Sequence, residues 1–138
     1  MKTNMGYVSF VMTTALLAAA CGGADSVDGG GRGLSEITAA ADEFSFSPDL
    51  WMVSAGSEVT FQFDNQGSVL HYWVILSSPI ESESEFSEDL IVFETSAEAG
   101  EAVTNTFTAP AAGTYQVICK VPGHFSDGME GLLTVTGA

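Results

Sequence analysis

The sequence predicts an all-β domain, a sandwich of short strands, that follows an N-terminal export signal and a flexible linker. Three observations support this prediction. Several short runs alternate apolar and polar residues with a period of two. Turn-forming residues separate these runs. A chain of 138 residues with 46% hydrophobic residues can fill one small core. We expect the folded domain to occupy residues 36–138.

Residues 1–20 have the features of an export signal. Lys2 supplies positive charge, and a largely apolar run from Tyr7 to Ala20 follows it. This run of about 14 residues is shorter than the roughly 20 that a membrane-spanning helix needs. It ends in small residues before Cys21, as in a bacterial lipobox, so we expect Cys21 to carry a lipid. Ordinary signal-peptidase cleavage after Ala18 or Ala20 and an uncleaved anchor are the alternatives.

Residues 21–35 are predicted to be a linker between the lipid and the domain. The segment is rich in glycine, polar and without periodicity. Chains of this composition behave as flexible tethers. The predicted location is therefore extracytoplasmic, in the periplasm or at the outer face of the cell membrane.

The strands of the domain are predicted from its apolar pattern. Residues 58–64 and 103–108 alternate, whereas residues 70–76 are almost all apolar and predict a buried strand. Two further strands are expected over residues 115–119 and 133–135. Turns that contain proline, glycine or asparagine separate these segments. Short strands at this spacing favour an antiparallel β-sandwich.

The acidic segment of residues 81–89 is predicted to be a surface loop with a helical turn. It is either a solvent-exposed loop with no docking role or an acidic patch that steers a cationic redox partner. The whole chain has 18 acidic and 3 basic residues, for a net charge of −15. Nucleic acid and anionic membrane surfaces are therefore poor partners, whereas a cationic protein is a plausible one.

The candidate functional residues lie around the second cysteine. Cys119, His124 and Met129 fall within eleven residues, in a loop that contains Pro122. Thiolate and thioether ligands favour copper, and two histidines and a cysteine with a weak axial methionine are typical of electron-transfer copper. His71, on the predicted buried strand, is the only other histidine. We therefore predict one copper ion, bound by His71, Cys119, His124 and Met129.

Other interpretations of these residues are a structural zinc site or no metal at all. Taken singly, each could be a core or surface residue. Zinc is disfavoured because its structural sites use cysteine and histidine rather than methionine. A multicopper oxidase or a nitrite reductase would need additional histidines for its other copper centres, so we expect no enzymatic activity. A disulfide between Cys21 and Cys119 is not expected, because one follows the leader and the other lies in the domain.

Residues 112–135 resemble the C-terminal copper loop of the cupredoxins, the small blue copper proteins. The Cys-x4-His-x4-Met spacing is most like that of auracyanin, and azurin and plastocyanin each share one of its two intervals. A second similarity to the family, nearer the N-terminus, begins at Phe44. The whole resemblance covers about residues 36–138. It implies an eight-stranded Greek-key sandwich with a type 1 copper ion at one end.

The resemblance also implies a function. Such a protein would be a monomer that carries single electrons between redox proteins such as a cytochrome or a membrane redox complex. Electrons would pass through a surface formed by His124, Pro122 and Phe125. A copper-trafficking or copper-buffering lipoprotein and a copper-free binding module are the other candidates.

The sequence departs from the family pattern beside two predicted ligands. Tyr72 follows the first histidine where asparagine is common, and Lys120 follows the cysteine where threonine or serine is common. In relatives these two side chains link the strand to the loop by hydrogen bonds. We therefore expect the surroundings of the sulfur to differ here, and with them the reduction potential.

Overall fold

A computed structural model of the chain describes residues 34–138. The predicted signal, Cys21 and residues 22–33 of the predicted linker lie outside the described residues. Two 3-10 turns, η1 (Glu83–Glu85) and η2 (Glu88–Leu90), are the only helices in the described part of the chain. None of its helices is long and apolar enough to cross a membrane.

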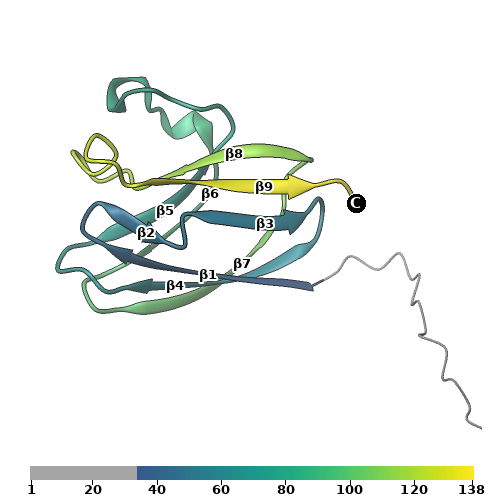
Figure 1. The fold of residues 1–138 in the computed structure, drawn as a ribbon, viewed down its shortest axis with the longest axis horizontal. Coiled ribbons are helices and arrows are strands. Elements are labelled where there is room, and N and C mark those ends of the chain that lie inside the picture. The colour runs from purple at the N-terminus through teal and green to yellow at the C-terminus, as the bar shows by residue number, and fades with distance from the viewer. Residues whose placement is uncertain (1–33) are drawn as a thin grey trace, which may run out of the picture.

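Nine strands form two sheets that pack face to face, which confirms the predicted β-sandwich (Figure 1). The first sheet has the order β2-β1-β4-β7, and the second has the order β3-β9-β8-β5-β6. The strands are β1 (Leu34–Asp42), β2 (Ser45–Ser47), β3 (Leu50–Ser54), β4 (Glu58–Asn65), β5 (His71–Leu76), β6 (Ile91–Ala97), β7 (Ala102–Thr108), β8 (Gly113–Ile118) and β9 (Glu130–Thr136).

The sheets differ from the expectation in two respects. They are mixed rather than purely antiparallel, because β1 pairs with β4 and β3 pairs with β9 in parallel. Parallel neighbours need a crossover; between β1 and β4 the chain crosses to the other sheet through β3 and returns. The described residues also form nine strands rather than eight, since the three-residue β2 pairs with the end of β1 in a hairpin.

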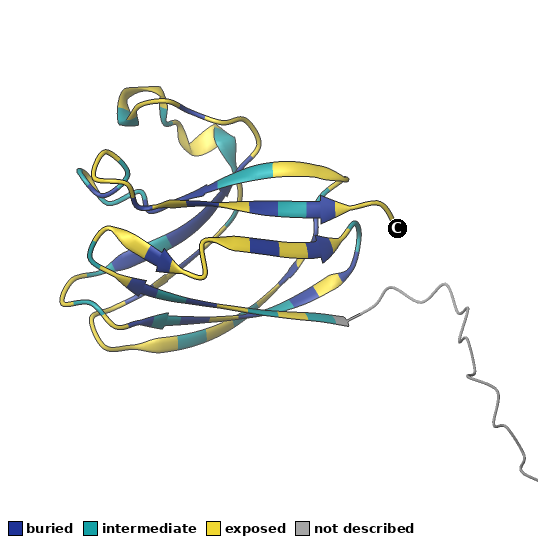
Figure 2. Cartoon of the chain, viewed as in Figure 1, coloured by how far each residue is buried: buried dark blue, intermediate teal, exposed yellow. Residues whose placement is uncertain are grey.

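Buried and exposed residues alternate along several strands (Figure 2). Most of the buried apolar residues form one large cluster, and Val74, Leu76, Ile80 and Ile118 form a second, smaller one. Val59, Phe61 and Phe63 of β4 are completely buried, whereas Glu58 and Gln62 are exposed. Trp73 of β5 is also completely buried, and its ring lies 4.2 Å from that of Phe61 between centroids. Aromatic side chains bury about 150–250 Å² each, so these rings supply much of the apolar area that holds the sheets together.

Gly131 of β9 lies at a close approach between β9 and β3, the edge strand of the second sheet. A methyl group on Gly131 of β9 would lie 2.5 Å from the carbonyl oxygen of Asp49 and 2.7 Å from the ring of Trp51. Real side chains do not tolerate such contacts, so the packing of β3 on β9 requires glycine here.

The β1–β2 turn, the β4–β5 connection and the β8–β9 loop come together at one end of the sandwich, at the left in Figure 1. The predicted ligands lie on the second and third of these connections, or directly beside them. The sandwich thereby brings together residues that are far apart in the sequence.

Candidate metal centre

Two histidines and a cysteine form a buried cluster at this end. His71 is the first residue of β5, Cys119 follows β8 directly, and His124 lies in the β8–β9 loop. Their donor atoms all lie within 4.8 Å of one another. Sγ of Cys119 is 3.5 Å from Nδ1 of His124 and 3.9 Å from Nδ1 of His71. Both rings therefore direct the same nitrogen toward the sulfur.

Backbone hydrogen bonds hold the β8–β9 loop in a compact form. The amide of His124 donates to the carbonyl oxygen of Val121 at 3.0 Å. Gly123 and Gly128 have φ values of 90° and 100°, which disfavour any residue with a side chain. The glycines therefore allow the loop to turn back over its short length.

The same loop places Met129 beside the cluster. Its amide donates to the carbonyl oxygen of His124 at 2.9 Å, and its own carbonyl oxygen accepts from the amide of Cys119 at 3.2 Å. The residue is completely buried. All four predicted ligands thus lie at one end of the core.

The comparisons with known proteins agree with this geometry. A family model described as "Copper binding proteins, plastocyanin/azurin family" matches residues 34–136. The chain belongs to this family. Auracyanin-A of Chloroflexus aurantiacus is 33% identical over 96% of both chains.

Two solved structures resemble this cupredoxin along most of its described length. Auracyanin A, a "blue" copper protein from Chloroflexus aurantiacus, has a TM-score of 0.66 and 34% identity over 75% of this chain and 100% of its own. Dithionite-reduced auracyanin from Roseiflexus castenholzii has a TM-score of 0.66 and 27% identity over 74% and 97%.

Copper is the cofactor of this cupredoxin, and the donor set fits it. Two imidazoles and one thiolate are the strong ligands of electron-transfer copper, and they converge here in a buried position. Bound copper supplies a one-electron change between Cu(I) and Cu(II). The residues of the chain fix the donor positions and exclude water.

Burial determines the protonation of two ligands. It raises the pKa of the Cys119 thiol, so this group carries a proton at neutral pH until a metal displaces it. Burial, followed by the charge of His124, lowers the pKa of His71, while the charges of Glu43 and Asp42 oppose this shift. His71 is therefore a neutral imidazole, which is the form that binds metal.

Tyr72 and Lys120, the two residues that depart from the family pattern, contact each other. Nζ of Lys120 lies 4.9 Å from the centroid of the Tyr72 ring and 2.7 Å from a carboxylate oxygen of Glu94. The backbone amide of Tyr72 donates to Sγ of Cys119 at 3.4 Å. The sulfur thus accepts a backbone hydrogen bond from the histidine strand, while Lys120 and Tyr72 form a cation–π contact outside it.

The acidic segment is attached to the copper loop. Its predicted helical character is confirmed by η1 and η2. Glu83 accepts hydrogen bonds from the amides of Gly123 at 2.8 Å and Ser126 at 3.2 Å. The bond from Ser126 is the largest factor that lowers the pKa of Glu83. Sequence reasoning missed this link, because no local pattern distinguishes Glu83 from the other acidic residues.

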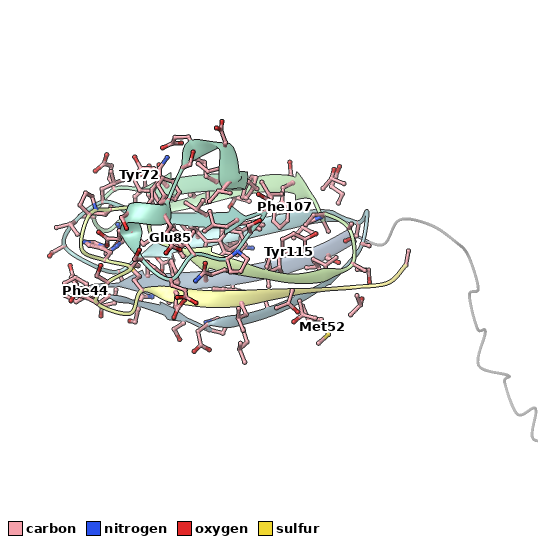
Figure 3. The ribbon with its side chains drawn as sticks, turned by 90° about the horizontal axis from the view of Figure 1, so that it is seen from above. Phe44, Met52, Tyr72, Glu85, Phe107 and Tyr115 are labelled. Carbon is pink, nitrogen blue, oxygen red and sulfur yellow. The ribbon has the colours of Figure 1, made fainter. Side chains whose placement is uncertain are left out.

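Phe44 borders the predicted electron-transfer surface, which the sequence did not indicate. His124 is only 8% exposed, while Pro122 is exposed and Phe125 half-buried. Phe44, in the β1–β2 turn, approaches the His124 ring edge-on at 5.3 Å and is 43% exposed. Figure 3 shows Phe44 at the same end as Tyr72, with Met52 toward the other end. Phe44 has a φ of 64°, which costs about 1 kcal/mol or more for a residue with a side chain.

Proposed function

We propose that this cupredoxin is an extracytoplasmic carrier of single electrons. The observation that supports the proposal most directly is the convergence of the donors of His71, Cys119 and His124 within 4.8 Å in a buried position. Ligands held by two strands and a hydrogen-bonded loop move little when the metal changes its oxidation state. A small rearrangement is what rapid electron transfer requires.

Met129 is proposed as the weak fourth ligand. Its backbone is hydrogen-bonded to both Cys119 and His124, and the residue is completely buried. A thioether is a soft donor that suits an axial position on copper. Met129→Leu would keep the packing while removing that donor.

Electrons are proposed to enter and leave beside His124. The exposed Pro122 and half-buried Phe125 flank His124 in the β8–β9 loop, and Phe44 packs edge-on against its ring. A small apolar surface of this kind favours brief, weak docking, because it offers little area and few fixed polar contacts. His124→Gly should therefore slow electron exchange with a cytochrome.

The redox partner is proposed to be cationic. Within residues 34–138, Lys120 is the only lysine or arginine, and its ammonium group is already paired with Glu94 and Glu88. Such an acidic surface accelerates encounters with positively charged proteins and disfavours nucleic acid. We propose that the protein acts as a monomer and that a lipid on Cys21 is its only attachment to the membrane.

The visible spectrum of the purified protein with Cu(II) tests the copper site. We expect an intense thiolate-to-copper band that Cys119→Ser abolishes. Cys21→Ser is the matched control, because it removes the other cysteine of the chain and should leave the band intact. A colourless Cu(II) protein, or a band that survives Cys119→Ser, would contradict the proposed site.

A second measurement separates an electron carrier from a copper-trafficking or copper-buffering protein. His71, Cys119 and Met129 are completely buried, so bound copper should leave slowly. We expect stopped-flow mixing with a cationic cytochrome to give fast, salt-sensitive electron exchange with no transfer of copper to a Cu(I) chelator. Rapid release of Cu(I) to the chelator with slow electron exchange would favour trafficking instead.

A further inference from the structure

The outer nitrogen of His71 is buried without a partner. Nδ1 of this ring faces Cys119, so Nε2 points away from the ligand cluster. Nε2 is fully buried and makes no hydrogen bond. A histidine that binds metal almost always donates its other ring N–H to a carboxylate, a carbonyl group or water. A partner is therefore expected on this side of the ring.

Gly67 lies directly opposite this nitrogen. A methyl group on Gly67 would be 2.7 Å from Nε2 of His71 and 3.0 Å from Oε1 of Glu43. The imidazole and the carboxylate therefore border the same position beside Gly67, and a methyl group there would clash with both.

Two hydrogen bonds hold Glu43 beside this position. Oε1 accepts from the backbone amide of Ser68 at 2.5 Å and from its hydroxyl group at 2.6 Å. These bonds lower the pKa of Glu43 to about 2, the hydroxyl group contributing most. The side chain therefore carries a negative charge at neutral pH.

We propose that Glu43 is the outer partner of the His71 imidazole and that Gly67 keeps the path between them open. Glu43 is thus a positioning residue that keeps the proton on Nε2, so that Nδ1 is free for copper. It also places a fixed negative charge behind one ligand. The inference rests on the copper site proposed above.

This arrangement has a consequence for the reduction potential. Copper gains one unit of positive charge when Cu(I) becomes Cu(II). A nearby carboxylate stabilises the more positive state, so it lowers the reduction potential. Removal of the charge should therefore favour Cu(I).

Glu43→Gln tests the proposal, because it removes the charge and keeps an oxygen that can accept both bonds from Ser68. The matched control is Glu58→Gln, which removes the same charge from an exposed residue at the other end of β4. Glu58 lies about 23 Å along β4 from Asn65, the last residue of the strand, which is two positions before Gly67. This separation exceeds the Debye length, so salt screens the charge of Glu58 from the copper site.

The first measurement is the Cu(I)/Cu(II) ratio at a fixed ambient potential, by spectroelectrochemistry. We expect Glu43→Gln to raise the ratio about fivefold, which is about 40 mV because a tenfold change in a one-electron couple is 59 mV. Glu58→Gln should change it less than twofold. The second measurement is the His71 Nε2–H resonance of the Cu(I) protein by NMR, which should shift in Glu43→Gln and stay in place in Glu58→Gln.

Equal ratios and equal resonances in the two variants would overturn the proposal. Gly67→Ala is an independent check, since its methyl group would clash with both groups and should move the same resonance. Failure of the copper site itself is distinguishable, because the wild-type protein would then lack the blue band. A protein with a blue band and no response to Glu43→Gln would refute only the role of Glu43.

Discussion

Asn65→Ala should destabilise the protein through the connection that leads to His71. Asn65 ends β4 and is completely buried. Its Nδ2 donates to the carbonyl oxygens of Val69 at 2.7 Å and Ala97 at 2.8 Å. Its Oδ1 accepts from the amide of Gly67 at 2.9 Å. One side chain thus holds the β4–β5 connection closed and ties it to β6.

The magnitude follows from the surroundings of the three partners. The bonds to Val69 and Gly67 are only partly buried, so water can take the place of Asn65 and the loss of each bond should cost about 1 kcal/mol. The bond to Ala97 is buried, so its carbonyl group would be left without a partner, which should cost about 2 kcal/mol. We therefore expect Asn65→Ala to lower the free energy of unfolding by about 4 kcal/mol, a large share of the 5–15 kcal/mol typical of a domain.

The assay is urea unfolding of the copper-free protein, followed by tryptophan fluorescence. The matched control is Asn105→Ala, because Asn105 donates a single, partly buried hydrogen bond to the hydroxyl group of Thr95 at 2.7 Å. That variant should lose about 1 kcal/mol. If the two alanine variants unfold at the same urea concentration with the same slope, the reasoning about the β4–β5 connection is wrong.

Three further predictions concern the site and its support. Lys120→Met should lower the free energy of unfolding by about 1 kcal/mol, as two ion pairs to exposed glutamates and a cation–π contact are lost; no change in thermal unfolding would contradict this. The apparent association constant for Cu(II) should rise about tenfold per pH unit between pH 7 and 9, because the raised pKa of Cys119 means that binding must displace its proton. A chelator competition that gives a pH-independent constant would refute this. Gly131→Ala should cost about 1–3 kcal/mol because its methyl group would meet Asp49, whereas Gly137→Ala, with nothing within 4 Å, should be neutral in the same denaturation assay.

Strands with a regular apolar pattern were predictable from the sequence, and others were not. In β4, every second residue enters the core, and the structure follows that alternation. β6 was missed because Val92, an exposed apolar residue, interrupts the alternation between Ile91 and Phe93. The parallel pairings of β1 with β4 and β3 with β9 were also missed. Strand direction depends on which sheet each connection enters, and no local residue pattern encodes that choice.

The sequence by itself determined the chemistry of the metal centre. Metal preference follows from ligand type, and a chain with two histidines offers few ways to assemble a copper site. The spacing from Cys119 to Met129 places three of the four predicted ligands in one short loop, whose path its glycines and hydrogen bonds define. These features are local, so the sequence displays them directly.

Only the tertiary structure decided what surrounds each ligand. Glu83 reaches Gly123 across 40 positions of sequence, and Lys120 reaches Glu88 across 32. Glu43 of the β1–β2 turn lies beside Gly67 and His71, which belong to the β4–β5 connection and the start of β5. Each contact depends on which turns meet at one end of the sandwich. Because such contacts result from the packing of whole sheets, no periodicity or motif in the sequence predicts them, whereas the ligand types and their spacing predict the metal.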